Sequence, residues 1–381
     1  MSFSLNTARI DLDAVAHNLG QVRKVVGPGV RIMGVVKADA YGHGLIPVAE
    51  VLERSGADAL GVMDLHEAVI LRDKGLNLSV FILAGFEAGS SDEIVRRGLI
   101  PFIYDLDLAR QLNQTAKKYG KKARVHLKVD TGMNRLGAPL DQVEGFLEAV
   151  RGMDHLEVSG LASHFSEAGI KDSDYTLRQL VRFKEVIETA RVKGYNLTTN
   201  NTANSAAVLS LPESHFDMVR PGLMLYGAAP EDHLASKIDL KPVMTLISKV
   251  IQVKKIGPDS PVSYGRKWVS GRETIIATLP VGYAHGYNRR LFNDGYVLIR
   301  GQRAPVRGVI CMNLTMVDVT HIPGARVGDE AVLLGSQGDE SISGPDLANK
   351  LGTISYEVFC TFGGLNHRQY VSSKNKKGEK A

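Results

Sequence analysis

The sequence predicts an α/β protein with an N-terminal (β/α)8 TIM-like barrel followed by a mainly antiparallel β domain. Three observations lead to this prediction. The chain has 381 residues, more than one small hydrophobic core can use. Apolar runs alternate with helical patterns through the first 240 residues, as in parallel α/β folds. The later runs are short, often β-branched and separated by Gly, Pro, Asn or Asp, which is typical of antiparallel sheets.

Eight apolar runs in the first part match the strand count of a (β/α)8 barrel. They are Arg31–Val36, Asp58–Val62, Ser79–Leu83, Ile100–Ile103, Arg124–Val129, Glu157–Ala162, Asn196–Thr199 and Asp217–Val219. Helical patterns between them include Leu106–Tyr119 and Tyr175–Lys193. The second pattern has apolar residues at helical spacing, namely Leu177, Leu180, Val181, Phe183 and Ile187. A further short strand over residues 9–12 precedes this set, and we expect it to pair with the β domain.

We place the barrel domain in residues 1–238 and the β domain in residues 239–372. The strand candidates of the β domain include Arg272–Leu279, Gly295–Arg300, Met316–Val319 and Glu330–Leu334, with one helix expected around Pro345–Leu351. Residues 373–381 are expected to form a disordered basic tail. Lys374–Ala381 contributes +3 to the net charge of +5, so only +2 remains for the other residues.

The composition argues against several classes of function. The sequence has no basic patch interleaved with aromatic residues, so nucleic-acid binding is not supported. The only cysteines, Cys311 and Cys360, provide neither a disulfide framework nor a zinc cluster, and we expect no metal. No apolar stretch approaches the eighteen residues that a membrane span needs. The start MSFSLNTARI does not resemble a secretory signal, so we expect a cytoplasmic protein.

The stretch VVKADAYGHG, residues 35–44, carries the strongest chemical signal. The apolar run ends abruptly at Lys37, as expected where a buried parallel strand reaches the barrel rim. A surface lysine after a strand is the simpler interpretation. In a partly dry setting, however, a lysine amine can lose its proton and form a Schiff base with a carbonyl.

Polar residues also follow the other predicted strands, where barrel enzymes place their reactive groups. They are Lys128, Asp130 and Arg135 in HLKVDTGMNRLG, His164 in SHF, Asn204 and Ser205 in NNTANSA, and Arg220 and Gly222 in VRPG. The loops after strands seven and eight are the usual phosphate site of this fold, and Ser205 with Gly222 fits a phosphate. Ser205 alone is equally explained as a helix N-cap. A cofactor that carries a phosphate and also an aldehyde for a lysine to bind is pyridoxal 5'-phosphate (PLP).

Arg220 and Tyr264 suggest what such a cofactor would do. An arginine beside the pyridine nitrogen cannot accept a proton, so the nitrogen stays neutral and the ring is a weak electron sink. That suits a reaction that removes and returns one proton. Inversion needs an acid or base on each face of the substrate, and Lys37 can serve one face. Tyr264, in PVSYGRKW, is a candidate for the other, although packing against the domain interface would also explain it.

From about Ala8 to Val371 the sequence resembles the alanine racemases, PLP-dependent enzymes of fold type III. The matching segments, in order, are VVKADAYGHG, HLKVDTGMNRLG, SHFSEA, NTANSA, MVRPGLMLYG, PVSYGRKW, LPVGYAHGY, ICMNLTMVDV and ISYEVFC. The resemblance implies an isomerase that interconverts L-alanine and D-alanine by two-base proton transfer. It further implies a role in supplying D-alanine for bacterial peptidoglycan, and a head-to-tail homodimer with shared active sites.

The resemblance also assigns roles to individual residues. Lys37 would carry PLP, and Tyr264 would be the opposite base, reaching the site of the partner chain. The cofactor-binding residues would be Tyr41, His164, Asn204, Ser205, Arg220, Gly222, Leu223 and Tyr356. The substrate-binding residues would be Arg135, Met312 and Tyr283, with Arg135 near the phenolic oxygen of the cofactor and Lys128 as a candidate for carboxylation.

Two positions depart from the family pattern. Asn201 stands where histidine is frequent and Asn313 where aspartate is frequent, and we expect both near the site entrance. Two other functions remain open. A PLP-dependent decarboxylase with the same domain plan would place a carboxylate at the pyridine nitrogen and use a cysteine-centred motif. A PLP carrier protein would be a single barrel without Tyr264.

Overall fold

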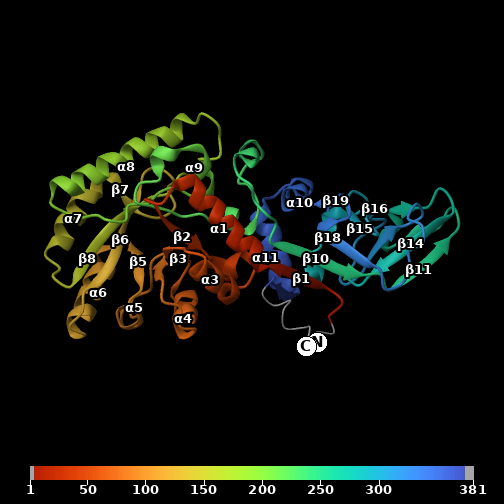
Figure 1. Ribbon diagram of the computed structural model, residues 1–381, viewed down its shortest axis with the longest axis horizontal. Helices are drawn as coiled ribbons and strands as arrows, with labels where there is room; N and C mark the ends of the chain where they lie inside the picture. Colours follow the sequence, from red (N-terminus) through yellow and green to blue (C-terminus); the bar gives the residue numbers. More distant parts are fainter. Residues whose placement is uncertain (1–3, 374–381) are drawn as a thin grey trace. The chain divides into compact units, whose positions relative to one another are not determined.

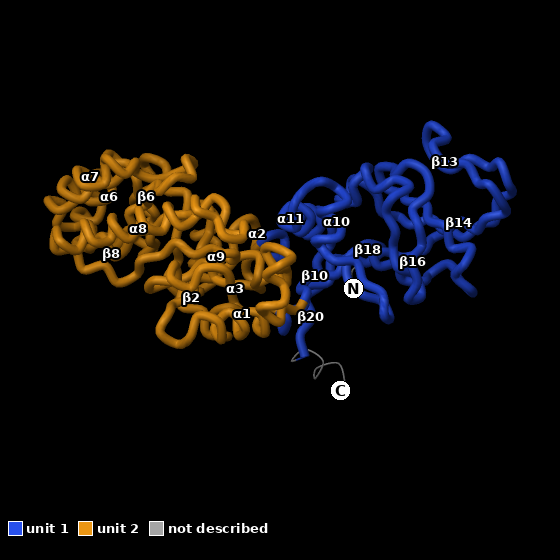
Figure 2. Tube along the Cα trace, turned by 90° about the horizontal axis from the view of Figure 1, so that it is seen from above, with its two compact units in different colours: residues 1–14, 41–44, 242–381 blue, residues 15–40, 45–241 orange. Residues whose placement is uncertain are grey.

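The computed structural model describes residues 4–373, and the chain divides into two compact units (Figure 2). Within the described residues, unit 1 consists of residues 4–14, 41–44 and 242–373, and unit 2 of residues 15–40 and 45–241. Residues 374–381, which hold nearly all of the predicted disordered tail, lie outside the described residues. Unit 1 therefore takes segments from both ends of the chain and a short piece from the barrel sequence.

Unit 2 is built on a parallel sheet with the order β7-β6-β5-β4-β3-β2-β9, in which β8 also pairs with β6. The strands are β2 (Arg31–Val35), β3 (Ala59–Val62), β4 (Ser79–Ile82), β5 (Ile100–Ile103), β6 (Ala123–Asp130), β7 (Ala138–Pro139), β8 (Leu156–Ala162) and β9 (Met218–Val219). The barrel interior is filled by a buried cluster that comes from six of these strands: Met33, Ala59, Phe81, Ile100, Phe102, Ala162 and Met218. This layering agrees with the predicted TIM-like architecture.

Helices flank the strands of unit 2 (Figure 1). The helices that begin or lie in this unit are α2 (Lys37–Tyr41), α3 (Leu45–Arg54), α4 (Leu65–Asp73), α5 (Ser91–Arg97), α6 (Leu106–Lys118), α7 (Val143–Arg151), α8 (Asp174–Val192) and α9 (Ser205–Ser210), together with α1 (Leu12–Val26), which starts in unit 1. Short 3-10 turns are η1 (Leu140–Gln142), η2 (Pro212–Ser214), η3 (Leu223–Tyr226) and η4 (Asp232–Lys237). No helix in the described part of the chain is long and apolar enough to cross a membrane.

The predicted strand Asn196–Thr199 is wrong, because this segment is irregular. Side-chain oxygens accept some of the backbone N–H groups that would otherwise bond to a neighbouring strand. The Leu161 N–H donates to Asn200 Oδ1 (3.0 Å), and the Asn200 N–H donates to Asp217 Oδ2 (2.8 Å). The segment still joins β8 to β9 through the backbone bonds Thr198 N to Ser159 O, Asn201 N to Leu161 O, Ser163 N to Asn201 O, Asp217 N to Asn200 O and Arg220 N to Ala203 O.

Unit 1 is mainly antiparallel, as predicted for the C-terminal part. Its largest sheet has the order β16-β15-β18-β10-β1-β20, with β19 paired to β18, and a second sheet has the order β11-β14-β17. The first strand, β1, lies between β10, which is antiparallel to it, and β20, which is parallel. Predicted strand 9–12 thus corresponds to a central strand of this unit.

The strands of unit 1 are β1 (Thr7–Asp11), β10 (Met244–Lys249), β11 (Gln252–Ile256), β12 (Pro261–Val262), β13 (Trp268–Val269), β14 (Thr274–Leu279), β15 (Tyr296–Ile299), β16 (Gln302–Pro305), β17 (Thr315–Asp318), β18 (Glu330–Gln337), β19 (Glu340–Ile342) and β20 (His367–Val371). Its helices and 3-10 turns are η5 (Tyr264–Arg266), η6 (Tyr283–His285), η7 (Arg289–Leu291), α10 (Gly344–Leu351) and α11 (Ser355–Leu365). The sequence predicted α10 but not α11.

The turn after Lys37 is left-handed. Ala38, Asp39, Ala40 and Tyr41 all have φ between 53° and 55°, although none of them is glycine. The left-handed helical region costs an L-residue about 1–2 kcal/mol. Contacts in unit 2 hold the turn, because Asp39 Oδ1 accepts from the Leu45 N–H (2.6 Å) and the Asp39 N–H donates to Glu67 Oε1 (3.2 Å). The chain thus maintains a strained conformation directly beside Lys37.

Ala40→Gly should therefore cost less stability than Ala49→Gly, by about 2 kcal/mol. Both alanines are fully buried, so each change removes one buried methyl group. Glycine relieves the left-handed strain at residue 40, whereas in the right-handed helix α3 it costs about 1 kcal/mol relative to alanine. Urea unfolding of the two variants measures the difference. Equal losses of unfolding free energy would contradict the strain argument.

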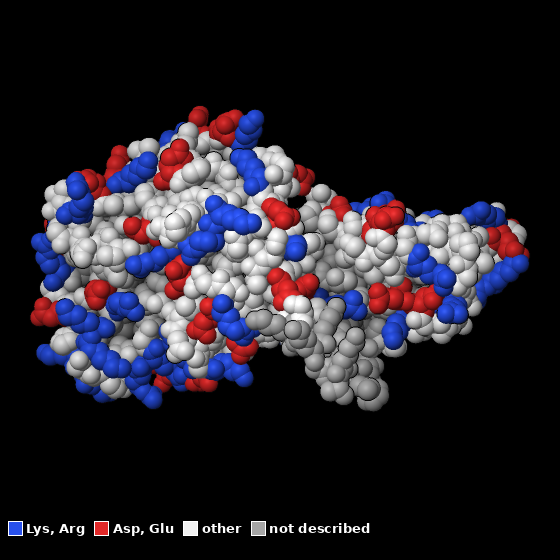
Figure 3. All heavy atoms as spheres, in the orientation of Figure 1, with Lys and Arg blue, Asp and Glu red and all other residues white. Residues whose placement is uncertain are grey.

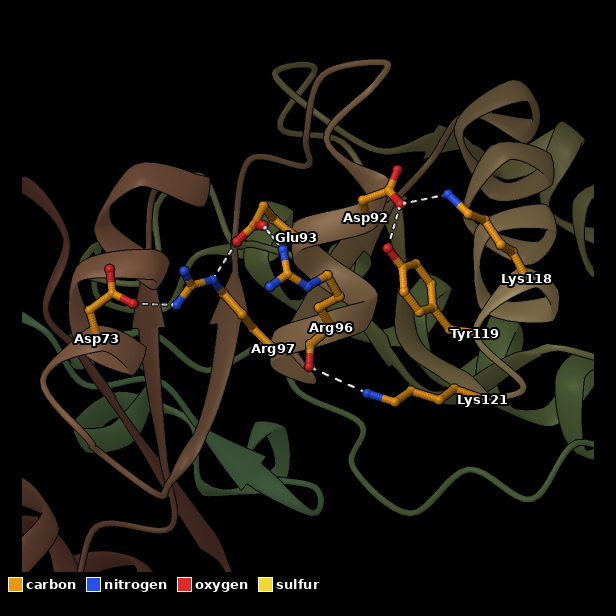
Figure 4. Close-up of polar contacts among 8 residues, drawn as sticks. All are labelled: Asp73, Asp92, Glu93, Arg96, Arg97, Lys118, Tyr119 and Lys121. Carbon is orange, nitrogen blue, oxygen red and sulfur yellow. Dashed lines mark hydrogen bonds and ion pairs between the residues drawn. The ribbon is translucent and has the colours of Figure 1, made fainter.

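The outer helices α4, α5 and α6 are connected by exposed polar contacts (Figure 4). Arg97 on α5 pairs with Asp73 on α4 at 2.5 Å, and Asp92 on α5 pairs with Lys118 on α6 at 3.4 Å and accepts from the Tyr119 hydroxyl at 2.8 Å. Acidic and basic side chains are interspersed over the visible face of the protein (Figure 3). Exposed pairs of this kind add little stability, so the packing of the buried helix faces determines the fold.

Candidate active site

Lys37 follows β2 at the carboxyl end of the parallel sheet. Val35 and Val36 before it are buried, and the lysine itself is half-buried. Its charge contributes to lowering the pKa of His164, which follows β8 in the same unit. The two predicted site residues therefore lie at the same end of the barrel.

Strand β6 directs alternate side chains towards the barrel interior, among them His126 and Lys128. Lys128 is buried, and its Nζ lies 6.0 Å from the centre of the Phe102 ring. The pKa of Lys128 is well below its usual value, chiefly because of burial and then because of Arg220 and Arg135. This amine is therefore readily available in its neutral, nucleophilic form.

The loop after β6 is shaped by Asp130. Its Oδ1 accepts from the Gly132 N–H at 2.8 Å and from the Asn134 N–H at 3.1 Å. Gly137, at φ 134°, lies so close to β6 that a Cβ would come within 2.6 Å of the Asp130 nitrogen. The glycines of this motif are thus needed for the loop to return tightly to the strand. Arg135 lies in this loop.

Arg220, immediately after β9, is buried and held by hydrogen bonds to neutral acceptors. Its Nη1 donates to the carbonyl oxygen of Asn201 (2.9 Å) and to Asn201 Oδ1. Its Nη2 donates to Ser163 O (2.6 Å), Thr202 O (3.3 Å) and His164 Nδ1 (3.1 Å). None of the carboxylates within residues 4–373 pairs with this guanidinium. The site therefore keeps an arginine whose charge is not neutralised by a carboxylate.

The prediction that Asn201 lies near the entrance is wrong. Asn201 is 0% exposed, and besides accepting from Arg220 it donates Nδ2–H to His126 Nδ1 (3.0 Å) and Thr199 O (2.9 Å). His126 in turn contacts Thr199 Oγ1 through Nε2 at 2.8 Å, and the Thr199 hydroxyl donates to Ser159 O. These bonds require a neutral His126 with its proton on Nε2. Burial, followed by the charges of Arg220 and Arg124, lowers the pKa of His126 to about 3.

Positive charge dominates the electrostatics of this region. Burial, and then Arg135, lowers the pKa of Arg220 to about 10. The pKa of His164 is well below its ordinary value because of burial and then because of Arg220, Lys128, Arg135 and Lys37. A neutral His164 can accept from Arg220, as the geometry requires. The clustered cations favour an anionic ligand.

The predicted phosphate loops come together in unit 2. Ser205 Oγ accepts from the Gly222 N–H at 2.9 Å, and both residues are buried. Asn204 is the N-cap of α9, because its Oδ1 accepts from the Ala207 N–H (3.0 Å), so the N-cap alternative for Ser205 is wrong. Leu223 follows Gly222 as the first residue of η3 and is also buried.

Two predicted cofactor ligands meet in unit 1. The ring centres of Tyr41 and Tyr356 are 5.6 Å apart, at an interplanar angle of 40°. Burial, followed by the charges of Tyr356 and Cys360, raises the pKa of Tyr41. Glycine makes the approach of the two segments feasible, because a Cβ on Gly42 would lie 2.5 Å from the carbonyl oxygen of Phe359 on α11.

A second group in unit 1 contains Tyr264, Tyr283 and Met312. The Tyr283 N–H donates to Cys311 O (3.2 Å), which places η6 against the segment that holds Met312. Ser263, before Tyr264, has its Oγ 3.4 Å from Cys311 Sγ. The three predicted residues thus share one region, and their side chains are 69%, 43% and 56% exposed, respectively. Asn313, next to Met312, is also exposed.

Several residues of the site were missed at the level of sequence. His126 belongs to the quoted HLKVD segment, two residues before Lys128, so period-two alternation indicated its inward direction. Asn201 was named as a departure from the family pattern, but its inward direction was not predicted, because the segment before it is irregular. Gln179 on α8 is fully buried and bonded to the ends of two loops, although glutamine in an amphipathic helix usually faces solvent.

Comparison of this sequence with known proteins identifies its family. Family models for the alanine racemase N-terminal domain and C-terminal domain match residues 10–230 and 243–370. The alanine racemase of Halothermothrix orenii is 42% identical over 371 residues, covering 97% of both chains, and that of Syntrophobacter fumaroxidans is 45% identical over 354 residues, covering 93% of this chain and 94% of the relative.

Solved structures match the fold. The alanine racemase of a D-cycloserine-producing Streptomyces lavendulae has a TM-score of 0.92 and 32% identity, covering 98% of each chain. The alanine racemase of Bartonella henselae, solved with covalently bound pyridoxal phosphate, has a TM-score of 0.87 and 27% identity, covering 97% of this chain and 100% of the other. The chain therefore belongs to the alanine racemase family, a family of isomerases.

Proposed function

We propose that this protein racemises alanine with PLP bound through Lys37. The observation that carries the proposal is a buried arginine, Arg220, held only by neutral acceptors at the barrel end where Lys37 emerges. An arginine in this place supports a neutral pyridine nitrogen, which suits reversible proton transfer better than decarboxylation. A solved relative that carries covalently bound pyridoxal phosphate supports the cofactor.

The residues of unit 2 fit such a cofactor. Thr202 Oγ1, beside Arg220, is buried and has no hydrogen-bond partner within the described residues, so it is available to a ligand. The positive charges of Arg135 and Arg220 complement the anionic groups of PLP, with Arg135 towards its phenolic oxygen. Ser205 and Gly222 already lie together at the loops that bind phosphate in this fold. Lys37 would hold the aldehyde.

Bound PLP supplies an aldehyde for the amino group of alanine and an electron sink for its α-carbon. The protein then has to move one proton on each face. Lys37 takes or gives the proton on one face through its Nζ amine, and the phenolic oxygen of Tyr264 does so on the other. His164 and Arg220, which are joined by a hydrogen bond, would support the ring of the cofactor. Tyr283 and Met312 would line the substrate end of the pocket.

Lys128 is proposed to be carboxylated. A buried amine with a strongly lowered pKa is nucleophilic towards carbon dioxide, and the resulting carbamate is an anion. An anion at this place would balance Arg135 and Arg220. Among the described residues, Asp130 is the one acidic group whose charge acts on Lys128. The carbamate would then position Arg135 towards the phenolic oxygen of the cofactor.

We further propose a head-to-tail homodimer in which Tyr264 of one chain serves the Lys37 site of the other. The exposed Tyr264, Tyr283 and Met312 support this arrangement, since large apolar side chains gathered on one surface favour a partner. Production of D-alanine for bacterial peptidoglycan, in the cytoplasm, completes the proposal, and the relatives named alanine racemase from Halothermothrix orenii and Syntrophobacter fumaroxidans support it.

Reduction with borohydride tests the cofactor assignment. Treatment of the PLP-loaded protein should fix a pyridoxyl group on Lys37, which peptide mass spectrometry locates. Lys37→Ala should carry no such group and should lose racemisation of L-alanine, because the covalent anchor and one base are both removed. Exposed Lys184→Ala is the control and should retain both properties. A pyridoxyl group on another lysine would refute the assignment.

A further inference from the structure

Gln179 is a buried polar residue that the proposed mechanism does not use. It lies on α8, outside the strands, and is 0% exposed. Its Nε2 donates to Thr131 Oγ1 (3.3 Å) and to His164 O (3.1 Å), while its Oε1 accepts from the N–H and the hydroxyl of Ser166, both at 3.0 Å. All four hydrogen-bonding positions of the amide are therefore occupied.

The partners of Gln179 belong to two different loops. Thr131 begins the loop after β6 that contains Arg135, whereas His164 and Ser166 belong to the segment after β8. Two neighbouring residues on the same face of α8 hold only the first loop: the Tyr175 hydroxyl donates to Gly132 O (2.6 Å), and Arg182 Nη1 donates to Thr131 O (3.0 Å). Of these three side chains, Gln179 alone bonds to both loops.

The contacts of Gln179 continue directly to Arg220. Thr131 Oγ1 lies 2.8 Å from Ser163 Oγ, and Ser163 O accepts from Arg220 Nη2 at 2.6 Å. His164 is fixed from two sides, since its carbonyl oxygen accepts from Gln179 and its ring Nδ1 accepts from Arg220. The position of the imidazole relative to the guanidinium therefore depends on the glutamine amide.

We propose that Gln179 is a positioning residue of the racemase site, which holds the loops after β6 and β8 in register and so fixes His164 against Arg220. The inference rests on the proposed function only in that His164 and Arg220 support the cofactor ring. Glutamate at this position has the same shape but cannot donate to Thr131 and His164 when ionised. Leucine leaves all four partners without their buried hydrogen bonds.

A purely structural role would lower stability without moving His164. Asn113→Leu is the matched control, because the Asn113 amide oxygen accepts from the His155 N–H (2.9 Å) just before the other end of β8. Gln179→Leu and Asn113→Leu should both lower the Tm. Gln179→Glu is the second test variant and keeps the volume of the side chain in case Gln179→Leu does not fold.

The readout is the ring nitrogen spectrum of His164 in full-length protein labelled with 15N-histidine, with and without PLP. The His164→Asn variant assigns the signal. In the wild type, His164 should remain the Nε2–H tautomer at neutral pH, because burial and the charges of Arg220, Lys128, Arg135 and Lys37 hold its pKa well below the ordinary value. In the Gln179 variants, its nitrogen shifts should change and titrate towards the ordinary pKa of about 6.5. In Asn113→Leu they should stay as in the wild type.

In the PLP-loaded enzyme, the Gln179 variants should lose roughly 10- to 100-fold in kcat with a smaller change in KM, as expected for misplaced site residues. Unchanged His164 signals in folded Gln179→Glu, or equal changes in Asn113→Leu, would overturn the proposal. The spectra do not depend on turnover, so this failure is distinct from a failure of the racemase assignment, which the mapping of Lys37 tests.

Discussion

Tyr264→Phe is expected to retain exchange of the α-proton of D-alanine while exchange on L-alanine and net racemisation collapse. Tyr264 and Lys37 are proposed to serve opposite faces of the substrate, with lysine acting on D-alanine and tyrosine on L-alanine. The change removes only the phenolic oxygen, so the lysine face remains intact. Removal of a positioned general base typically costs ~10²–10⁴-fold in rate. The side chain is 69% exposed, so the loss of its hydroxyl should hardly affect folding.

Deuterium incorporation into each enantiomer, measured separately by NMR in deuterated water, tests this asymmetry. Tyr119→Phe is the control, because it also removes an exposed phenol, one that donates to Asp92 on the outer helices (Figure 4). That variant should behave as the wild type. Equal residual exchange from both enantiomers in Tyr264→Phe would show that one base, or a water molecule, serves both faces.

A mixture of Lys37→Ala chains with Tyr264→Phe chains should recover about a quarter of the wild-type activity, although each variant alone is inactive. If subunits redistribute at random, half of the dimers are hybrids, and each hybrid contains one intact site and one site that lacks both bases. Recovery requires that Lys37 and Tyr264 of one site come from different chains. A site completed within one chain would give no recovery at all.

Native mass spectrometry of the two variants, one of them isotopically labelled, establishes how many hybrids form. Mixtures of Lys37→Ala with labelled Lys37→Ala are the control, because they exchange subunits but contain no intact site. Activity that rises in proportion to the hybrid fraction supports the shared site. Full exchange without any activity would exclude it, while leaving the cofactor assignment to Lys37 unaffected.

The fold was predictable where burial follows a simple period. Seven of the eight predicted barrel strands are present, because they are short apolar runs that are largely buried between helices and core. The predicted strand Asn196–Thr199 is absent, because Asn200 and Asp217 replace backbone ladder bonds with side-chain bonds. Helix α11 was missed, since only one helix was expected in the β domain and the paired glycines of this segment, Gly363 and Gly364, are unfavourable in a helix.

Helix α8 shows a limit of periodicity. The predicted helix is present, but Leu177 and Val181 are 48% and 54% exposed while Gln179 is buried. The hydrophobic pattern alone cannot reveal that two loop ends present enough donors and acceptors to satisfy an amide completely. Such a residue is recognisable only when its partners, which lie 13 to 48 positions away along the chain, have been located.

The candidate site was predictable to the extent that strand ends mark the active face of a barrel. Lys37, Lys128, His164, Ser205 and Arg220 all follow or end strands of unit 2 or its irregular segment, as the sequence indicated. Asn201 was misplaced because the segment that carries it is not a regular strand, so the inward or outward direction of its side chain could not be inferred. The left-handed turn after Lys37 was also unforeseen, since alanine, aspartate and tyrosine rarely adopt that conformation.

Incubation of the PLP-loaded wild-type protein with L-alanine in deuterated water tests the proposed function most directly. We expect deuterium at the α-carbon together with a loss of optical rotation, and chiral chromatography should show L-alanine and D-alanine approaching equal amounts. The amino acid should remain intact throughout. Release of carbon dioxide would identify a decarboxylase, and a PLP-loaded protein that causes neither exchange nor loss of rotation would contradict the racemase assignment.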